Sequence, residues 1–153
     1  MVPARPEDIS ELAAQGFREI DEFECRAVTG TSAAEQCFAS LKNPTAETFT
    51  VMADGTPVAM FGAAPLVGMG IEPGLCVLWF LATDRLFEVR YDLMRQIGVW
   101  LDWLQRFSPT GINFVSVDNH IALAWCKAVG FEIGEPTPHG INGEMFRPVI
   151  RRL

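Results

Sequence analysis

Two aspartates stand at positions where this chain could transfer a proton. Asp84 follows the continuous apolar run Leu75 to Ala82, and Asp118 follows the alternating run that ends at Val117. Open α/β sheets bind ligands at the ends of neighbouring strands, so either aspartate is a candidate base that would accept a proton from a substrate. Each aspartate could instead cap the helix that follows it, because its side chain can accept a hydrogen bond from a free N–H of the first turn.

The segment from Val115 to Phe131 carries the most informative pattern in the chain. Residues 115–117 alternate toward a core, and then Asp118 or Asn119 can cap a helix. Apolar residues recur at helical spacing after this point, at Ile121, Ala122, Trp125 and Val129. Gly130 can adopt the left-handed conformation that ends a helix. The segment therefore predicts a strand, a capped helix and a stop.

This segment resembles the second signature of the GNAT superfamily of N-acetyltransferases. That signature reads Asn, two residues, Ala, an aliphatic-Tyr pair, and Gly-Phe, and here these places are held by Asn119, Ala122, Trp125-Cys126 and Gly130-Phe131. In many relatives the Tyr protonates the departing thiolate, so the resemblance makes Cys126 a candidate acid, with an ordinary thiol pKa of about 8.5. The alternative for Cys126 is a thiol packed in the core.

The resemblance implies acetyl-CoA as the cofactor and indicates where it would bind. In the family, the turn that holds the pyrophosphate reads Arg or Gln, two residues, Gly, one residue, then Gly or Ala. Here Arg85 keeps the first position, Glu88 and Val89 occupy the region where glycines would admit the phosphates, and Arg85 and Arg90 could offset the charge of Glu88. We therefore predict a degenerate phosphate turn. The remaining predicted contacts are strand-end residues and the helix opening: Leu81, Ala82, Thr83, Asn119, and Trp125 as an aromatic floor or a core residue.

The elements that would position these residues can be read from hydrophobic periodicity and turn signals. In chain order we expect an edge strand at 2–5, helices at 6–17, 18–26 and 32–41, a hairpin at 49–64 around Asp54-Gly55, a buried strand at 75–82, a long helix through 89–104, a strand at 112–117, a short helix, and two strands between 131 and 150. This order predicts one α/β domain over residues 1–153, with helices on both faces of a mixed sheet. It is similar to the GNAT order, which implies a mostly antiparallel sheet with a splayed parallel pair, 75–82 and 112–117, open beside Asn119.

Composition narrows the classes of function. The chain has 153 residues, 49% of them hydrophobic, and a net charge of −7, which opposes binding to nucleic acid. The chain contains no run of about 18 apolar residues, so no membrane span is predicted. Met1 to Asp8 lacks the apolar stretch of a signal peptide, so we expect a cytoplasmic protein. The four cysteines have no paired spacing and are expected to be free thiols. Neither histidine has a neighbour at the spacing of metal ligands, so no metal site is expected. The basic residues Arg147, Arg151 and Arg152 are expected to form a solvated tail.

A second, narrower resemblance concerns bacteriophage. The segment Trp79 to Asp84, the long helix, and the strand that ends at Asp118-Asn119-His120 look like a GNAT-like family of short-tailed phages, whose members are internal virion or assembly proteins. Two hypotheses follow, because the same fold can carry different sites. One is an enzyme that transfers an acetyl group from acetyl-CoA to the amine of a small molecule or a protein. The other is an inactive phage virion or assembly protein that binds other virion proteins, in the particle or the host cytoplasm.

Overall fold

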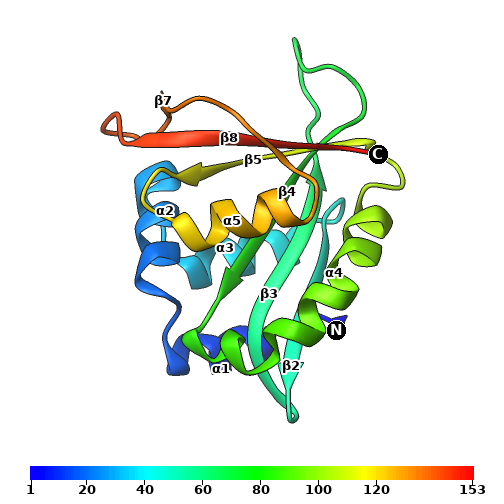
Figure 1. The fold of residues 1–153 in the computed structure, drawn as a ribbon. Helices are drawn as coiled ribbons and strands as arrows, with labels where there is room; N and C mark the ends of the chain where they lie inside the picture. The colour runs from blue at the N-terminus through cyan, green and yellow to red at the C-terminus, as the bar shows by residue number, and fades with distance from the viewer.

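One mixed sheet of eight strands forms the centre of the computed structural model, which describes residues 1–153 (Figure 1). The strands lie in the order β1-β2-β3-β4-β5-β8-β6, and β7 also pairs with β8. Every pair is antiparallel except β4 and β5. This confirms the predicted sheet. The strand bounds are β1 Val2–Pro3, β2 Glu47–Ala53, β3 Thr56–Pro65, β4 Leu75–Ala82, β5 Thr110–Ser116, β6 Glu132–Ile133, β7 Thr137–Pro138 and β8 Met145–Arg152.

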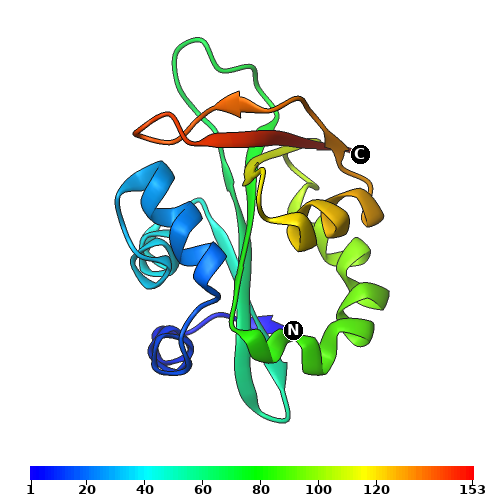
Figure 2. The same ribbon diagram turned by 60° about the vertical axis from the view of Figure 1, so that its left-hand side comes forward.

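Helices cover both faces of the sheet, as the element order predicts. The helices α1, α2 and α3 lie on one face, and α4 and α5 lie on the other (Figure 2). A cluster of 14 buried residues packs the sheet against α4, and a cluster of 6 packs it against α1 and α3. None of the helices combines the length and the apolar composition that a membrane span requires. Their bounds are α1 Pro6–Gln15, α2 Glu19–Thr29, α3 Ala33–Lys42, the 3₁₀ helix η1 Asp84–Val89, α4 Arg90–Leu104 and α5 His120–Ala128.

The parallel strands β4 and β5 are joined only at their first residues. Three residue pairs connect them, namely Leu75 with Thr110, Cys76 with Gly111, and Val77 with Ile112. Beyond these pairs β4 stays with β3 as far as Ala82, and β5 stays with β8 as far as Ser116, so the two strands separate. The predicted opening between the two strands is therefore confirmed.

The hairpin of β2 and β3 follows directly from its turn residues. Asp54 and Gly55 have φ values of 48° and 78°, which is the positive-φ pair that a tight hairpin of this type requires. Glycine adopts this conformation without steric cost, and aspartate is among the residues that tolerate it. This turn matches the prediction and fixes the register of the long β3 strand against which β4 pairs.

The start of the long helix differs from the prediction. Residues Asp84–Val89 form a 3₁₀ helix, and the α-helix begins only at Arg90. Asp84 opens the 3₁₀ helix, and the residue at the cap position of α4 is Val89, so Asp84 does not cap α4. Asp118 does not cap α5 either, because Asn119 holds that position and its Oδ1 accepts from the Ala122 N–H at 3.2 Å. The capping alternative is therefore wrong for both aspartates.

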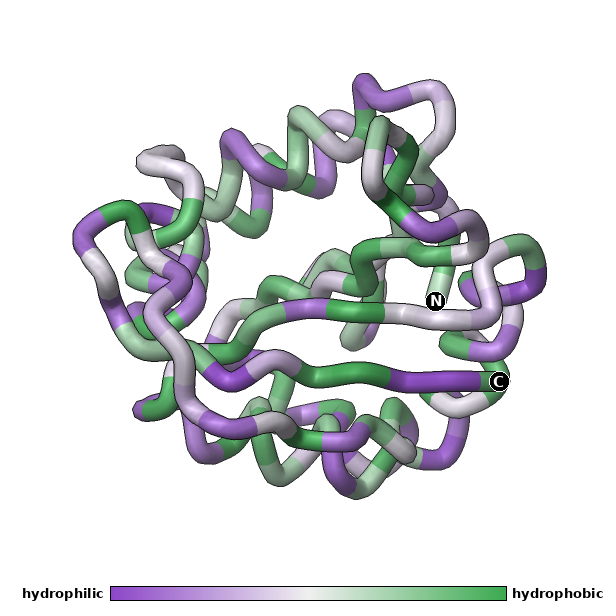
Figure 3. The backbone as a smooth tube through the Cα atoms, turned by 90° about the horizontal axis from the view of Figure 1, so that it is seen from above, coloured by the Kyte–Doolittle hydropathy of each residue, from purple (hydrophilic) through white to green (hydrophobic).

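The C-terminal basic cluster is part of the sheet and not a tail. Arg147, Arg151 and Arg152 lie on β8, a strand that pairs with β5 on one side and with β6 and β7 on the other. Figure 3 shows the hydrophilic end of this strand beside the C-terminus. Arg151 donates to the Val129 carbonyl at 3.1 Å and to Asp102 at 2.5 Å. Sheet pairing and local partners hold these arginines in place.

Candidate active site

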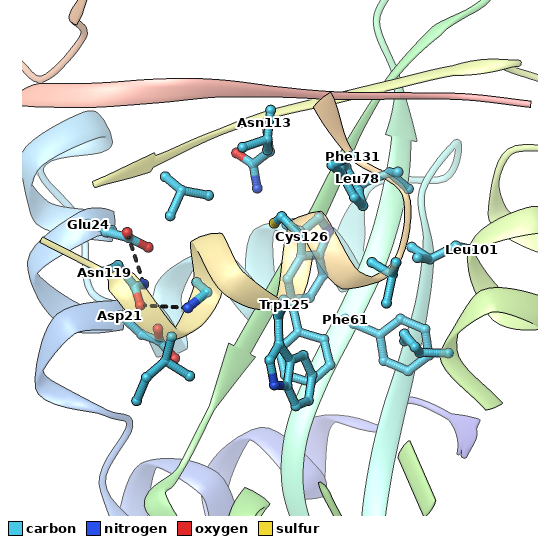
Figure 4. A pocket seen from close by; sticks show the side chains of 18 of the residues that line it. Asp21, Glu24, Phe61, Leu78, Leu101, Asn113, Asn119, Trp125, Cys126 and Phe131 are labelled. Atoms are coloured by element: carbon cyan, nitrogen blue, oxygen red, sulfur yellow. Dashed lines mark hydrogen bonds between the residues drawn. The ribbon is translucent and has the colours of Figure 1, made fainter. Parts of the chain in front are cut away.

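A cavity of about 160 Å³ lies in the opening between β4 and β5, and it is lined mostly by apolar side chains (Figure 4). Asp21 and Glu24 of α2 line it from one face of the sheet. Leu101 of α4 and Cys126 of α5 line it from the other face. Because helices from opposite faces share one cavity, the opening connects the two sides of the sheet. Two ligands could meet inside it.

The β4 edge of this cavity carries backbone groups that no strand pairs with. The N–H of Ala82 donates to Asp21 Oδ2 at 2.9 Å and its C=O accepts from the Arg18 N–H at 2.8 Å, so both groups point away from β3. Backbone direction alternates along a strand, so the N–H and C=O of Phe80 point the same way. β5 has already diverged at this level. Phe80 therefore offers a donor and an acceptor to an extended ligand.

The β5 edge differs, because side-chain oxygens already accept hydrogen bonds from its backbone N–H groups. The Phe114 N–H donates to Asn113 Oδ1 at 2.7 Å, and the Ser116 N–H donates to Glu24 Oε1 at 2.8 Å. This leaves little on β5 for a ligand backbone to pair with. The asymmetry leaves β4 as the edge of the opening with unpaired backbone groups.

Asp21 ties the end of β4 to α2. Its carboxylate accepts from Arg18 Nε at 3.0 Å and Nη2 at 2.6 Å, in addition to the Ala82 N–H. The Asp21 side chain is only 1% exposed, and every oxygen has a partner. A buried carboxylate with both oxygens bonded to the protein is suited to a structural role, because a substrate proton would have to compete with Arg18 and the Ala82 N–H for it.

Glu24 lies one turn further along α2 and has a different environment. Its Oε1 accepts both the Ser116 N–H at 2.8 Å and Asn119 Nδ2 at 3.1 Å, whereas no protein donor bonds to Oε2 (Figure 4). Burial raises the pKa of the Glu24 carboxyl, and the two donors offset part of that effect. Residue-by-residue reading of the sequence missed Glu24. One signal was present: Asp21 and Glu24 face inward while Phe23 between them is 43% exposed, which inverts the usual pattern of a surface helix.

The two predicted bases, Asp84 and Asp118, lie outside the cavity but share one neighbouring hollow. Both side chains are exposed and line this hollow together with Glu19 and Phe23. The structure thus brings the two aspartates to the same surface, on the side of the cavity that α2 covers. Asn119 lines both the cavity and the hollow and is 4% exposed.

The predicted acid Cys126 and the predicted aromatic floor Trp125 both line the cavity. Burial raises the pKa of the Cys126 thiol to about 11, and the nearby Glu24 carboxylate adds to that effect, so the thiol is protonated at neutral pH. The Trp125 ring packs edge-on against Phe80, with 5.8 Å between ring centroids. Trp125 therefore forms a wall beside the open edge of β4.

The predicted phosphate turn is the 3₁₀ helix η1. Arg85 and Glu88 pair with each other on the surface, with nitrogen–oxygen distances of 2.8 and 2.9 Å, so the carboxylate of Glu88 is neutralised locally. Leu86 fills the core beneath. Arg90 lines the cavity, and its Nη1 donates to the Phe87 carbonyl at 2.7 Å. Arg90 therefore lies beside the cavity at the start of α4, Arg85 is paired with Glu88, and side chains fill the region of the family's glycines.

The predicted contacts at the end of β4 are largely engaged within the protein. Both backbone groups of Ala82 are bonded to α2 and the residue before it, and the Thr83 N–H donates to the Val58 carbonyl at 2.9 Å. Leu81 belongs to the smaller core cluster, on the side of α1 and α3. The unpaired backbone groups of β4 thus lie at Phe80, on the same edge of the strand as those of Ala82 and before it in the chain.

The order of elements, the opened parallel pair and the helix capped by Asn119 match the GNAT fold. Three solved structures with this fold are similar along almost the whole chain. The ribosomal-protein-alanine N-acetyltransferase of Brucella melitensis has a TM-score of 0.69 at 15% identity, covering 99% of this chain and 98% of that one. A GNAT-family acetyltransferase of Streptococcus pneumoniae has a TM-score of 0.64 at 14% identity, covering 99% and 96%.

The third is aminoglycoside acetyltransferase AAC(6')-Ib, solved with paromomycin and acetyl-CoA. It has a TM-score of 0.68 at 13% identity, covering 98% of this chain and 90% of that one. No family model and no curated protein sequence matches the chain. The likeness is therefore one of fold.

Proposed function

We propose that this protein transfers an acetyl group from acetyl-CoA to an amine. The observation that carries the proposal is the opening between β4 and β5, which joins both faces of the sheet through one cavity and leaves the Phe80 backbone free. An amide-containing arm such as pantetheine could pair with that backbone, and an amine could reach the same point from the α2 side. The similar structures solved with coenzyme A or acetyl-CoA support this assignment.

The residues present fit the acetyl donor unevenly. The Phe80 edge and the Trp125 wall suit a pantetheine arm, and Arg90 suits the pyrophosphate by charge, whereas Arg85 is already paired with Glu88. The 3₁₀ helix η1 gives the phosphates less room than a glycine turn would. The donor supplies the activated acetyl group, and the chain supplies positioning and proton transfer. We expect weak but specific binding.

The direct test is thermal melting and calorimetry with acetyl-CoA. At about 100 times its dissociation constant, a ligand stabilises the folded protein by about 2.7 kcal/mol, which raises the melting temperature by several degrees. Arg90→Ala should weaken binding because Arg90 lines the cavity. Arg95→Ala is the matched control, because Arg95 lies on the same helix and pairs with Asp92 on the surface. No melting shift at millimolar acetyl-CoA would contradict the proposal.

A second candidate function is that of a phage virion or assembly protein that has this fold but does not transfer acetyl groups. The observation that favours it is the filled phosphate turn, in which Glu88 holds Arg85 and Leu86 packs into the core. The loop between β3 and β4 also exposes Val67 and Met69, at 84% and 104%. A protein that binds no acetyl-CoA, and that sediments as a complex with a phage structural protein, would favour this candidate.

A further inference from the structure

The anchoring of Glu24 distinguishes it from every other acid near the cavity. One oxygen, Oε1, is fixed by two donors that come from different elements, the Ser116 N–H at the end of β5 and the Asn119 side chain at the start of α5. The other oxygen, Oε2, accepts no hydrogen bond from the protein, yet the residue lines the cavity. A carboxylate held by one oxygen and free at the other has a fixed direction and an available lone pair.

Resting on the acetyl transfer proposed above, we propose that Glu24 Oε2 is the catalytic base that takes the proton from the acceptor amine. Asn119 is then a positioning residue, because its Oδ1 caps α5 while its Nδ2 orients Glu24. The acceptor belongs to the class of protonated primary amines, as the surroundings of Glu24 indicate.

The route to Glu24 starts at the hollow that Asp84 and Asp118 line. Hollow and cavity share Arg18, Phe87, Asn119 and Ile121 along their borders, so they are adjacent. Glu19, Asp84 and Asp118 give the hollow three carboxylates against the single cation Arg18. Such a surface attracts an ammonium group and leads it toward Glu24. The two aspartates would therefore attract the amine, and Glu24 would take its proton.

The other charged or titratable groups of the cavity do not compete for this role. They are Arg18 and Asp21, which bond to each other, Arg90 on the opposite side, and the Cys126 thiol. Asp21 has no free oxygen, and a thiol that keeps its proton at neutral pH cannot accept another. Burial raises the pKa of Glu24 toward the range in which a carboxylate is an effective base.

The proposed transfer removes two protons from the amine nitrogen, one to Glu24 and one to the departing sulfur. The ammonium gives one proton to Glu24 Oε2, and the neutral nitrogen forms a bond to the thioester carbonyl carbon. The carbon–sulfur bond breaks, and the departing sulfur receives a second proton from the nitrogen, which yields the amide and free coenzyme A. Glu24 returns its proton to solvent. Nothing is oxidised or reduced.

The test compares Glu24→Gln with Glu11→Gln, the same chemical change at an exposed position of α1. The acceptors are a panel of primary amines that includes spermidine and a short peptide with a free N-terminus, and acetylated product is detected by mass spectrometry. For Glu24→Gln we expect kcat to fall roughly 100- to 10,000-fold, with acetyl-CoA affinity within twofold of the wild type. Glu24→Asp should keep part of the activity, because a carboxylate remains.

A second readout does not depend on turnover. With ¹³C-carboxyl glutamate, the resonance absent from Glu24→Gln reports the titration of Glu24, and its midpoint should lie above that of ordinary glutamates. Unchanged kcat in Glu24→Gln, or a Glu24 midpoint at the ordinary value, would overturn the assignment of Glu24 alone. A wild-type protein that neither binds acetyl-CoA nor acetylates any amine would overturn the transferase proposal and this assignment with it.

Discussion

The two carboxylates of α2 close the same end of the β4–β5 opening in two different ways. Asp21 attaches to β4 and has both oxygens bonded, to Arg18 and to the Ala82 N–H. Glu24 attaches to β5 and α5 through one oxygen and leaves the other free. The two residues lie one helical turn apart and have the same charge. We infer that the number of hydrogen-bond partners, and not burial alone, separates a structural carboxylate from a candidate base.

The largest expected effect falls on the structural member of this pair. Asp21→Ala would leave the Arg18 guanidinium and the Ala82 N–H without their partner in a buried place, so we expect a loss of about 3–5 kcal/mol in the free energy of unfolding. Asp92→Ala, which removes an exposed ion pair with Arg95, should cost less than about 1 kcal/mol. Urea unfolding measures both. Equal small losses would mean that Asp21 does not hold β4 to α2.

A smaller effect should separate the two adjacent residues that open α5. Asn119→Ala removes the helix cap and a donor to Glu24, so we expect a loss of about 1–2 kcal/mol. Asp118→Ala changes an exposed side chain and should alter the free energy of unfolding by less than about 0.5 kcal/mol. If Asp118→Ala cost as much as Asn119→Ala in the same urea experiment, the cap would be misassigned.

Glu24→Gln should raise the free energy of unfolding, whereas Asp21→Ala and Asn119→Ala should lower it, and the size of the gain should depend on pH. A folded-state pKa raised above its unfolded value gives stability that is present at low pH and is lost as pH rises through the folded pKa. The neutral glutamine escapes this loss, so the variant should be more stable than the wild type at pH 8, with a gain that shrinks toward pH 4. Melting temperatures across this range measure the gain. A variant that is less stable at pH 8 would show that Glu24, like Asp21, serves the fold.

The mildest change concerns the cofactor side of the opening. Glu88→Gly removes a carboxylate and gives phosphates room at the start of α4, so acetyl-CoA should bind several-fold more tightly in calorimetry. Glu88→Ala separates the two causes, because it removes the charge but restores less room. Unchanged affinity in both variants would indicate that acetyl-CoA does not reach this turn.

Local signals predicted much of the fold. The Asp54-Gly55 turn, the apolar run of β4 and the Asn119-to-Gly130 segment each specify their own structure through short-range chemistry. The start of α4 was harder, because a 3₁₀ turn and an α-helical turn share similar periodicity over six residues. The prediction of a solvated tail for the basic residues of β8 is wrong, because only the sheet pairing shows that they lie on a strand.

The chemistry of the site depends on contacts that a linear reading does not contain. Glu24 bonds to Ser116 and Asn119, which are 92 and 95 residues away, and Asp21 bonds to Ala82 across 61 residues. The inward-facing acids of α2 were the available signal, since a helix that exposes Phe23 and turns carboxylates inward must have partners for them. The strand ends predicted Asp84 and Asp118 as candidate bases, but the carboxylate with one anchored oxygen is Glu24 of α2.

Amide NMR during titration with acetyl-CoA tests whether the unpaired edge of β4 binds the acetyl donor. If acetyl-CoA binds there, the Phe80 amide should shift most along β4, while the amide of Leu81, which faces β3, should shift far less. Millimolar acetyl-CoA that leaves the Phe80 resonance in place, or that shifts only residues remote from the opening, would contradict binding at this edge.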